Sequence, residues 1–204
     1  MFKGLTAQYL LKKTHAGKAG EIILVHAAAG GVGQIMCQWA KGLGALVIGT
    51  ASSEEKCAIA REAGCSIAIN YSRENWQAAL LEATGGKKAD VVYDSVGKDT
   101  FLKSLDCAAP FGLVVLFGAA SGPAPAIEPE LLNKKGCLFL TRPSVFPHNA
   151  DPAIFRANAA DLFAAISSGL VRSHIGTRFS LDDVVKAHRA AESRATQGAT
   201  LIIP

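Results

Sequence analysis

The sequence predicts an α/β protein with a doubly wound parallel sheet of strand order 3-2-1-4-5-6. Three observations support this fold class. Short apolar runs alternate with segments of helical periodicity from residue 22 to residue 141. The first run stops at small residues, and a helical pattern starts directly after them. The spacing between runs suits strand–helix–strand units, whose right-handed crossovers produce parallel strands.

The expected elements alternate along the first two thirds of the chain. A leading helix over residues 4–13 carries one apolar face and ends in a glycine-containing polar stretch. The strands that follow are apolar and short, at residues 22–25, 45–50, 66–70, 90–94, 113–117 and 136–141. The helices between them are expected at residues 32–43, 53–63, 75–84 and 99–108, with Gly44 and Gly64 as stop signals and serines 52 and 53 as a start signal.

The pattern changes after Arg142 and Pro143. A loop is followed by helices expected at residues 152–169 and 181–194 and by a last apolar strand at residues 200–203. We therefore divide the chain into a nucleotide-binding domain with its leading helix, residues 1–144, and a C-terminal tail, residues 145–204.

The first strand ends in a fingerprint for dinucleotides. The turn contains Ala28, Gly30 and Gly33, which is the G-x-G-x-x-G pattern with alanine in its first position. Gly30 allows close approach of a pyrophosphate, and Gly33 allows the helix to pack closely on the strand. The amides of a helix N-terminus favour such an anion. The alternatives are a tight turn without a ligand and a methyltransferase, which would be expected to carry an acid after the second strand.

The residues after the second strand favour NADPH over NADH. An NAD site usually carries an acidic residue there for the ribose 2′-hydroxyl, whereas this chain has Ser52 and Ser53, with Lys56 one helical turn later. Small hydroxyl residues and a lysine suit a 2′-phosphate. Glu54 and Glu55 stand close enough to keep NADH open as an alternative.

Further residues converge on the same edge of the sheet. Ligands of open α/β sheets bind at the carboxyl ends of the strands, where the strand order reverses. Tyr71 is placed there to cover the adenine, Ser95 follows the fourth strand, and Phe117 and Gly118 end the fifth beside the nicotinamide.

Composition narrows the function classes. The net charge is +4 with 21 scattered basic residues, which does not indicate a nucleic-acid binder, and the apolar runs are too short for a membrane span. The five cysteines form no C-x-x-C pair and have no histidine at ligand spacing, so we expect no zinc site, no disulfide framework and a reducing, cytoplasmic location. No Ser-His-Asp set or paired carboxylates stand out, and we assign no catalytic acid or base.

Several motifs together resemble one family. They are HAAAGGVGQ from residue 26, CQWAK from 37, INY from 69, VVYDSVG from 91, TRPS from 141 and ESRATQG from 192. The chain resembles the zeta-crystallin-like quinone oxidoreductases, in the zinc-free branch of the medium-chain dehydrogenases/reductases, whose cofactor domain has the Rossmann fold. The resemblance implies hydride transfer from NADPH to a quinone. It also implies cofactor contacts for residues matching family positions, namely Tyr9, Gly31, Val32, Ser52, Ser53, Lys56, Tyr71, Ser95, Phe117, Gly118 and Arg194.

The resemblance also implies that one domain of the family is absent from this sequence. Family members carry an N-terminal catalytic domain ahead of the position of Met1, to which residues 145–204 normally return. Two functions stay open: a quinone reductase, and a module that binds NADPH without catalysis, as a truncated form or a remnant. Finally, the strand at residues 136–141 is expected at the sheet edge, where unpaired backbone groups predict a homodimer by strand pairing.

Overall fold

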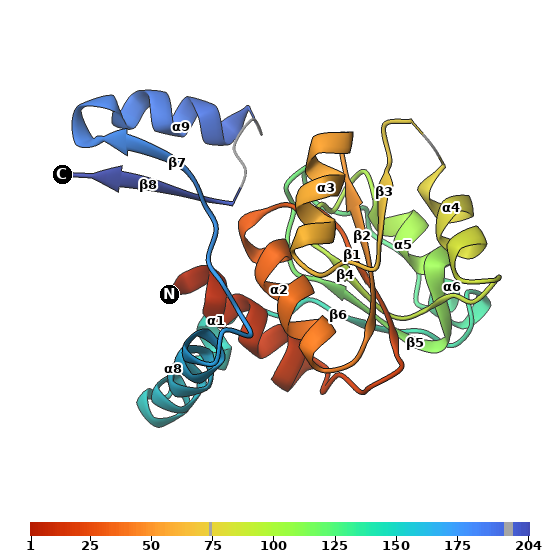
Figure 1. The fold of residues 1–204 in the computed structure, drawn as a ribbon. Helices are drawn as coiled ribbons and strands as arrows, with labels where there is room; N and C mark the ends of the chain where they lie inside the picture. The colour runs from red at the N-terminus through yellow and green to blue at the C-terminus, as the bar shows by residue number, and fades with distance from the viewer. Residues whose placement is uncertain (74, 194–197) are drawn as a thin grey trace.

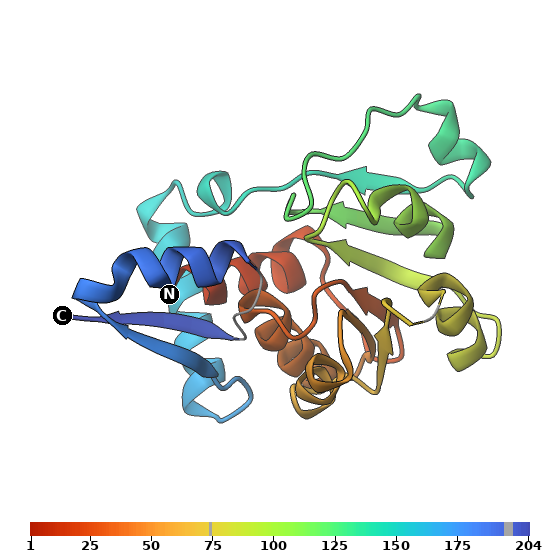
Figure 2. The ribbon, with the colours of Figure 1, turned by 90° about the horizontal axis from the view of Figure 1, so that it is seen from above.

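The computed structural model describes residues 1–73, 75–193 and 198–204. Its centre is a parallel sheet of six strands in the order β3-β2-β1-β4-β5-β6 (Figures 1 and 2). The predicted order is therefore confirmed. The strands are β1 (Ile22–Val25), β2 (Leu46–Ala51), β3 (Ile67–Asn70), β4 (Ala89–Asp94), β5 (Ala108–Leu116) and β6 (Phe139–Thr141). All five strand pairs of this sheet run parallel.

Helices cover both faces, and each face encloses a hydrophobic core. Alternate residues of β1 point to opposite sides, Ile23 and Val25 to one cluster and Ile22 and Leu24 to the other. The first cluster includes residues of α1 (Phe2–Tyr9), α2 (Gly31–Gly42), α3 (Glu54–Glu62) and α8 (Pro152–Ser167). The second includes residues of α4 (Trp76–Ala83), α5 (Phe101–Cys107) and α6 (Glu130–Lys134). All four residues of β1 are buried, as in the middle of a sheet covered on both faces.

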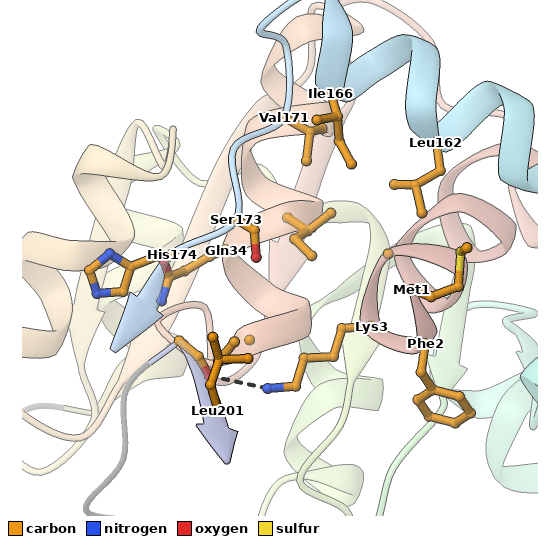
Figure 3. Close-up of a pocket in the computed structure, with 15 residues that line it drawn as sticks. Met1, Phe2, Lys3, Gln34, Leu162, Ile166, Val171, Ser173, His174 and Leu201 are labelled. Carbon is orange, nitrogen blue, oxygen red and sulfur yellow. Dashed lines mark hydrogen bonds between the residues drawn. The ribbon is translucent and has the colours of Figure 1, made fainter. Parts of the chain in front are cut away.

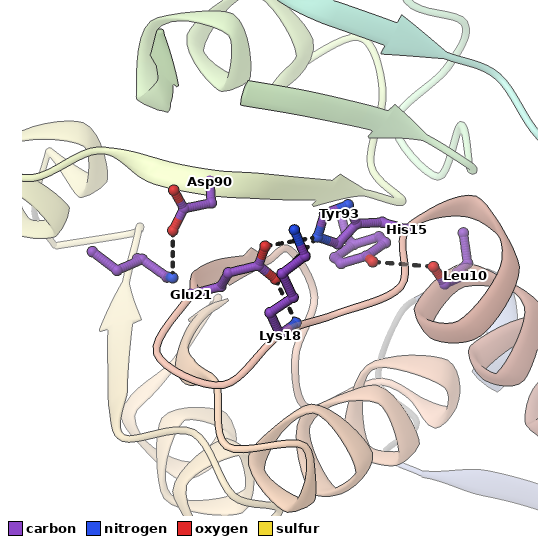
Figure 4. A network of polar contacts seen from close by, with 7 residues as sticks. Leu10, His15, Lys18, Glu21, Asp90 and Tyr93 are labelled. Atoms are coloured by element: carbon purple, nitrogen blue, oxygen red, sulfur yellow. Dashed lines mark hydrogen bonds and ion pairs between the residues drawn. The ribbon is translucent and has the colours of Figure 1, made fainter. Parts of the chain in front are cut away.

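The loop into β1 is fixed by a polar network (Figure 4). A π-helical turn over Leu10–Thr14 extends α1, and Tyr93 of β4 donates to the Leu10 carbonyl at 3.1 Å. The Glu21 carboxylate accepts a hydrogen bond from Lys18 N at 2.8 Å and contacts His15 Nε2 at 3.0 Å. Partial burial raises the pKa of Glu21, but these two contacts and the nearby charges of His15 and Lys18 bring the pKa below its ordinary value. The network aligns the leading helix with the start of the sheet.

Two predicted boundaries were wrong for reasons of backbone geometry. The fifth strand was expected at residues 113–117, but β5 begins at Ala108, directly after α5, with a register shift against β4. The sixth strand was expected from residue 136, but Gly136 and Cys137 have φ angles of 118° and 54°, which strands do not use. These two residues form the turn out of α6, an element that was not predicted, and β6 starts at Phe139.

The C-terminal residues contain more structure than expected. A strand that the prediction missed, β7 (Ile175–Ser180), pairs in parallel with β8 (Ala199–Ile203) in a separate sheet of two strands. Between them lie a 3₁₀ turn (Leu181–Asp183) and α9 (Val184–Glu192), where one helix over 181–194 was expected. A short helix, α7 (Val145–His148), precedes α8. Figure 1 shows β7, β8 and α9 standing apart from the larger sheet.

The helix α8 connects the segment that contains β7, α9 and β8 to the part of the chain that contains the larger sheet. It packs on α1, where a Cβ atom at Gly4 would lie 2.5 Å from Leu162 Cδ2. Gln8 of α1 donates to Asp161 of α8 at 3.0 Å. Farther on, the carboxamide of Gln38 donates to the Arg172 carbonyl at 3.0 Å and accepts from its amide at 2.8 Å. In the described part of the chain, no helix is long and apolar enough to cross a membrane.

Candidate nucleotide site

A pocket lies where the strand order reverses. Its cavity volume is about 200 Å³, and the residues that line it lie at or just after the carboxyl ends of β1, β2, β3 and β4, with one more from the loop after β5. They are Ala27, Ala29, Gly30, Ala51, Ser52, Lys56, Tyr71, Val96 and Ala120. Four of the predicted residues, Gly30, Ser52, Lys56 and Tyr71, therefore lie around one pocket. The lining residues Ala27, Ala29 and Ala120 were not predicted, because their small side chains carry no chemical signal.

The glycine-rich turn has the geometry that its sequence predicts. Gly30 is the N-cap residue of α2, with φ −74° and ψ 168°, and its amide donates to the Ala27 carbonyl at 2.9 Å. At Gly33 a Cβ atom would lie 2.4 Å from Ala27 O and 2.8 Å from Ala28 Cα. Only glycine allows this approach, so the helix N-terminus lies directly against the end of β1. Val32, on the first turn of α2, packs against the core below.

The end of β2 provides a cation and hydroxyl groups. Lys56 is half-buried in the first turn of α3, and its backbone amide donates to Ser53 Oγ at 3.3 Å. Ser53 is thus the N-cap residue of α3, while Ser52 faces the pocket. Tyr71 stands at the rim with 43% of its surface exposed.

Glu54 and Glu55, the acidic residues that made NADH an alternative cofactor, have other partners. Glu54 Oε1 accepts from Asn70 Nδ2 at 2.9 Å, and Glu54 Oε2 lies 3.8 Å from Arg61. A hydrogen bond with Ser53 lowers the pKa of the exposed Glu55. Neither acid lines the pocket, whereas Lys56 does. Of these three charged residues, Lys56 is thus the one placed at the pocket.

Three of the predicted residues lie together beside the end of β4. Ser95 Oγ donates to the His26 carbonyl at 3.4 Å, and Phe117 N donates to the Asp94 carbonyl at 2.9 Å. A Cβ atom at Gly118 would lie 2.3 Å from Ser95 O, so the segments after β4 and β5 touch through their backbones. Ser95, Phe117 and Gly118 do not line the pocket; the neighbouring Val96 and Ala120 do.

Gly31 faces a second, adjoining cavity of about 340 Å³ (Figure 3). A Cβ atom at Gly31 would meet Lys3 Nζ at 2.6 Å, and Lys3 Nζ donates to the Gly198 carbonyl at 3.2 Å. Gln34, Ser173 and His174 also line this cavity. Sequence reasoning missed Lys3, because a lone lysine just before the predicted leading helix gives no sign that it will reach the start of α2.

Two residues assigned through the resemblance lie away from the pocket or outside the described residues. Tyr9 is buried, and its ring stacks on His148 with 4.5 Å between centroids. Burial raises the pKa of Tyr9 to about 12, against an opposing effect of Arg142. Arg194 lies outside the described residues. Among the residues that the structure describes, no cluster of three or more His, Cys, Asp or Glu side chains could hold a metal ion.

Comparisons with known proteins agree with this geometry. A family model for zinc-binding dehydrogenases matches residues 31–151. The chain is 50% identical to a quinone oxidoreductase of Pseudomonas aeruginosa and 45% identical to a 2-haloacrylate reductase of a Burkholderia species, in both cases over its whole length. The crystal structure of Escherichia coli quinone oxidoreductase complexed with NADPH, 46% identical, matches all of this chain with a TM-score of 0.96.

The chain spans only part of these relatives, 63% of the Pseudomonas protein, 62% of the Burkholderia protein and 63% of the crystallised Escherichia coli chain. The family model nevertheless covers more than half of this sequence, including the helix after the glycine-rich turn and strands β2 to β6. By its sequence and by its fold, the chain belongs to the zinc-binding dehydrogenase family.

Proposed function

We propose that this chain binds NADPH at the carboxyl edge of its sheet, and that the protein reduces a quinone by hydride transfer from that cofactor. One observation carries the proposal: Gly30, Ser52, Lys56 and Tyr71, from the segments after β1, β2 and β3, line one pocket at the reversal of strand order. Similar proteins are named quinone oxidoreductases, and one of them was crystallised with NADPH.

The described residues fit such a cofactor. The backbone of the turn at Gly30 and the start of α2 suit a pyrophosphate, because no side chain covers the glycine and the helix dipole favours an anion. Lys56 and Ser52 suit the 2′-phosphate, and Tyr71 suits the adenine. We also propose Gly31, Val32, Gly33, Ser53, Ser95, Phe117 and Gly118 as cofactor-binding residues, together with Tyr9 and Arg194 on the family resemblance. Bound NADPH supplies the hydride, and the chain orients it.

The first experiment tests binding and the choice of cofactor. NADPH and NADH are titrated calorimetrically into the parent chain, Lys56→Ala and the control Lys87→Ala. Lys87 is exposed at the opposite end of the sheet. Lys56→Ala should raise the Kd for NADPH about tenfold or more, as expected for one lost charge-assisted contact, and leave NADH binding unchanged. Equal NADPH affinity in the parent and Lys56→Ala would overturn the assignment.

The second experiment separates catalysis from simple binding. The chain is incubated with NADPH and a benzoquinone, and absorbance of the reduced nicotinamide is followed. Oxidation above the uncatalysed rate supports the reductase. Binding without turnover supports the other candidate, an NADPH-binding module, for this polypeptide.

We further propose a homodimer formed through β6. The support is that β6 ends the sheet order and that Phe139 on it, like Phe111 on β5, is largely exposed, at 62% and 70%. Light scattering should show a dimer for the parent and for the control Phe163→Lys, whose side chain is exposed on α8, but a monomer for Phe139→Lys. A monomeric parent at high concentration would refute this. We also propose a cytoplasmic location, and the support is that none of the five cysteines forms a disulfide in the structure.

A further inference from the structure

A chain of four buried polar side chains runs beneath the pocket. Asp94 ends β4, Ser104 lies in α5, His26 follows β1, and Thr50 lies in β2. All four are buried, with at most 1% of their surface exposed. The contacts are 2.8 Å from Ser104 Oγ to Asp94 Oδ2, 3.0 Å from His26 Nε2 to Ser104 Oγ, and 2.8 Å from His26 Nδ1 to Thr50 Oγ1. We call this set the buried relay.

The buried relay underlies three walls of the pocket. Ala27 follows His26, Ala51 follows Thr50, and Val96 lies two residues after Asp94; all three line the pocket. Asp94 also holds the turn after β4 directly. Its Oδ1 accepts from the amides of Val96 at 2.9 Å and Gly97 at 3.0 Å, and its carboxylate accepts from Thr100 Oγ1 at 2.8 Å. The function proposed above uses none of these four side chains.

The hydrogen bonds of the relay can run in only one direction. A carboxylate only accepts, so the Ser104 hydroxyl donates to Asp94. Ser104 Oγ must then receive the proton of His26 Nε2. Burial lowers the pKa of His26, against an opposing effect of Asp94, so the ring is neutral and carries one proton. Its Nδ1 therefore accepts from the hydroxyl of Thr50.

We propose that Asp94 is a positioning residue for the cofactor pocket. Its carboxylate holds the turn at Val96 and Gly97 and, through the relay, fixes His26 as the tautomer protonated at Nε2. The turns after β1, β2 and β4 are thereby held in one arrangement before the cofactor arrives. This inference rests on the proposed binding of NADPH in that pocket.

The first test reverses the direction of the hydrogen bonds in the relay but keeps the contacts between its side chains. In Asp94→Asn, the amide oxygen keeps the contacts of Oδ1, and the NH₂ group replaces Oδ2 as a donor. Ser104 then accepts from residue 94 and donates to His26 Nε2, which moves the ring proton to Nδ1. Long-range proton–nitrogen correlation spectra at alkaline pH distinguish the two tautomers. We expect Nε2–H in the parent and Nδ1–H in the variant. The same tautomer in both proteins would overturn the relay.

The second test measures how tightly the pocket binds NADPH. Asp94→Ala removes the contacts to the turn; if the turn then spends about a tenth of its time in the binding arrangement, the Kd for NADPH rises about tenfold. The control is Tyr93→Phe, the adjacent residue, whose hydroxyl bonds to Leu10 on the other face of the sheet. Its Kd should equal that of the parent.

The outcomes separate this inference from the proposed function. Normal NADPH affinity in a folded Asp94→Ala variant overturns the positioning role and leaves the proposed function intact. Failure of the parent to bind NADPH overturns the proposed function and the positioning role together, while the tautomer switch still decides the direction of the relay. If Asp94→Ala does not fold, Asp94→Asn provides the decision. Its neutral amide oxygen holds the amides of Val96 and Gly97 more weakly than the carboxylate does, so the Kd for NADPH should rise by more than about twofold, and a Kd equal to that of the parent overturns the positioning role.

Discussion

The close contact at Gly33 yields a quantitative prediction. In Gly33→Ala the new Cβ atom would lie 2.4 Å from the carbonyl oxygen of Ala27 and 2.8 Å from Ala28 Cα. Both obstacles are backbone atoms of the turn, so relief requires α2 to move away from β1. Overpacking of this kind costs about 1–3 kcal/mol, and the obstacle here places the cost near the upper end. The higher helix propensity of alanine returns about 1 kcal/mol.

The expected net destabilisation is therefore about 1–2 kcal/mol, which corresponds to a melting temperature lower by about 2–8 °C for a chain of this size. Urea unfolding monitored by circular dichroism measures the change in the free energy of unfolding. Because the turn must shift, the Kd for NADPH should rise in the same variant.

Gly42→Ala is the matched control, since it makes the same change in the same helix. There a Cβ atom would approach Leu170 Cδ1 at 2.2 Å, the far end of a partly exposed side chain that can rotate away. We expect this variant to be as stable as the parent or slightly more so. If both variants are equally stable, the reasoning from close approach at Gly33 is refuted.

Two further predictions concern titratable groups. Burial lowers the pKa of His26 in the folded chain below the ordinary value of 6.5. Below pH 6.5 the unfolded chain therefore binds a proton that the folded chain does not bind. The free energy of unfolding should then fall as the pH falls, by up to about 1.4 kcal/mol per pH unit. Urea titrations between pH 7 and pH 5 should show a smaller slope for His26→Gln, and an unchanged slope would contradict the assignment. Four of the five cysteines are buried outside any disulfide, and burial raises the pKa of Cys107 to about 12. A thiol reagent should therefore react quickly with Cys137 alone in the folded chain and with all five thiols in denaturant, whereas a second fast thiol would contradict the packing.

The larger sheet could be predicted because its signals are local. Each strand is a short apolar run, and parallel order follows from the alternation with helices. Boundaries failed where one residue decides the backbone, as at Cys137, whose positive φ no composition rule anticipates. The strand β7 was missed because its alternation of Ile175, Thr177 and Phe179 is brief and its partner lies some twenty residues later in the sequence.

The nucleotide site could be predicted in part for the same reason. Turns after neighbouring parallel strands meet at one edge, so Gly30, Ser52, Lys56 and Tyr71 could be brought together from topology alone. The approach of Lys3 to Gly31 depends on how α1 crosses α2, which no spacing encodes. The role of Asp94 also needs coordinates, since its partners Ser104 and His26 come from separate elements.

The carboxamide of Gln38 has a consequence for how this chain tolerates change. Because the group has both an NH₂ that donates and an oxygen that accepts, it satisfies both polar atoms of the Arg172 main chain, as a neighbouring strand would. A glutamate at position 38 would keep the acceptor but lose the donor, and would place an anion against a carbonyl oxygen. Position 38 thus requires a side chain that both donates and accepts hydrogen bonds, although its place on a helix gives no sign of this requirement.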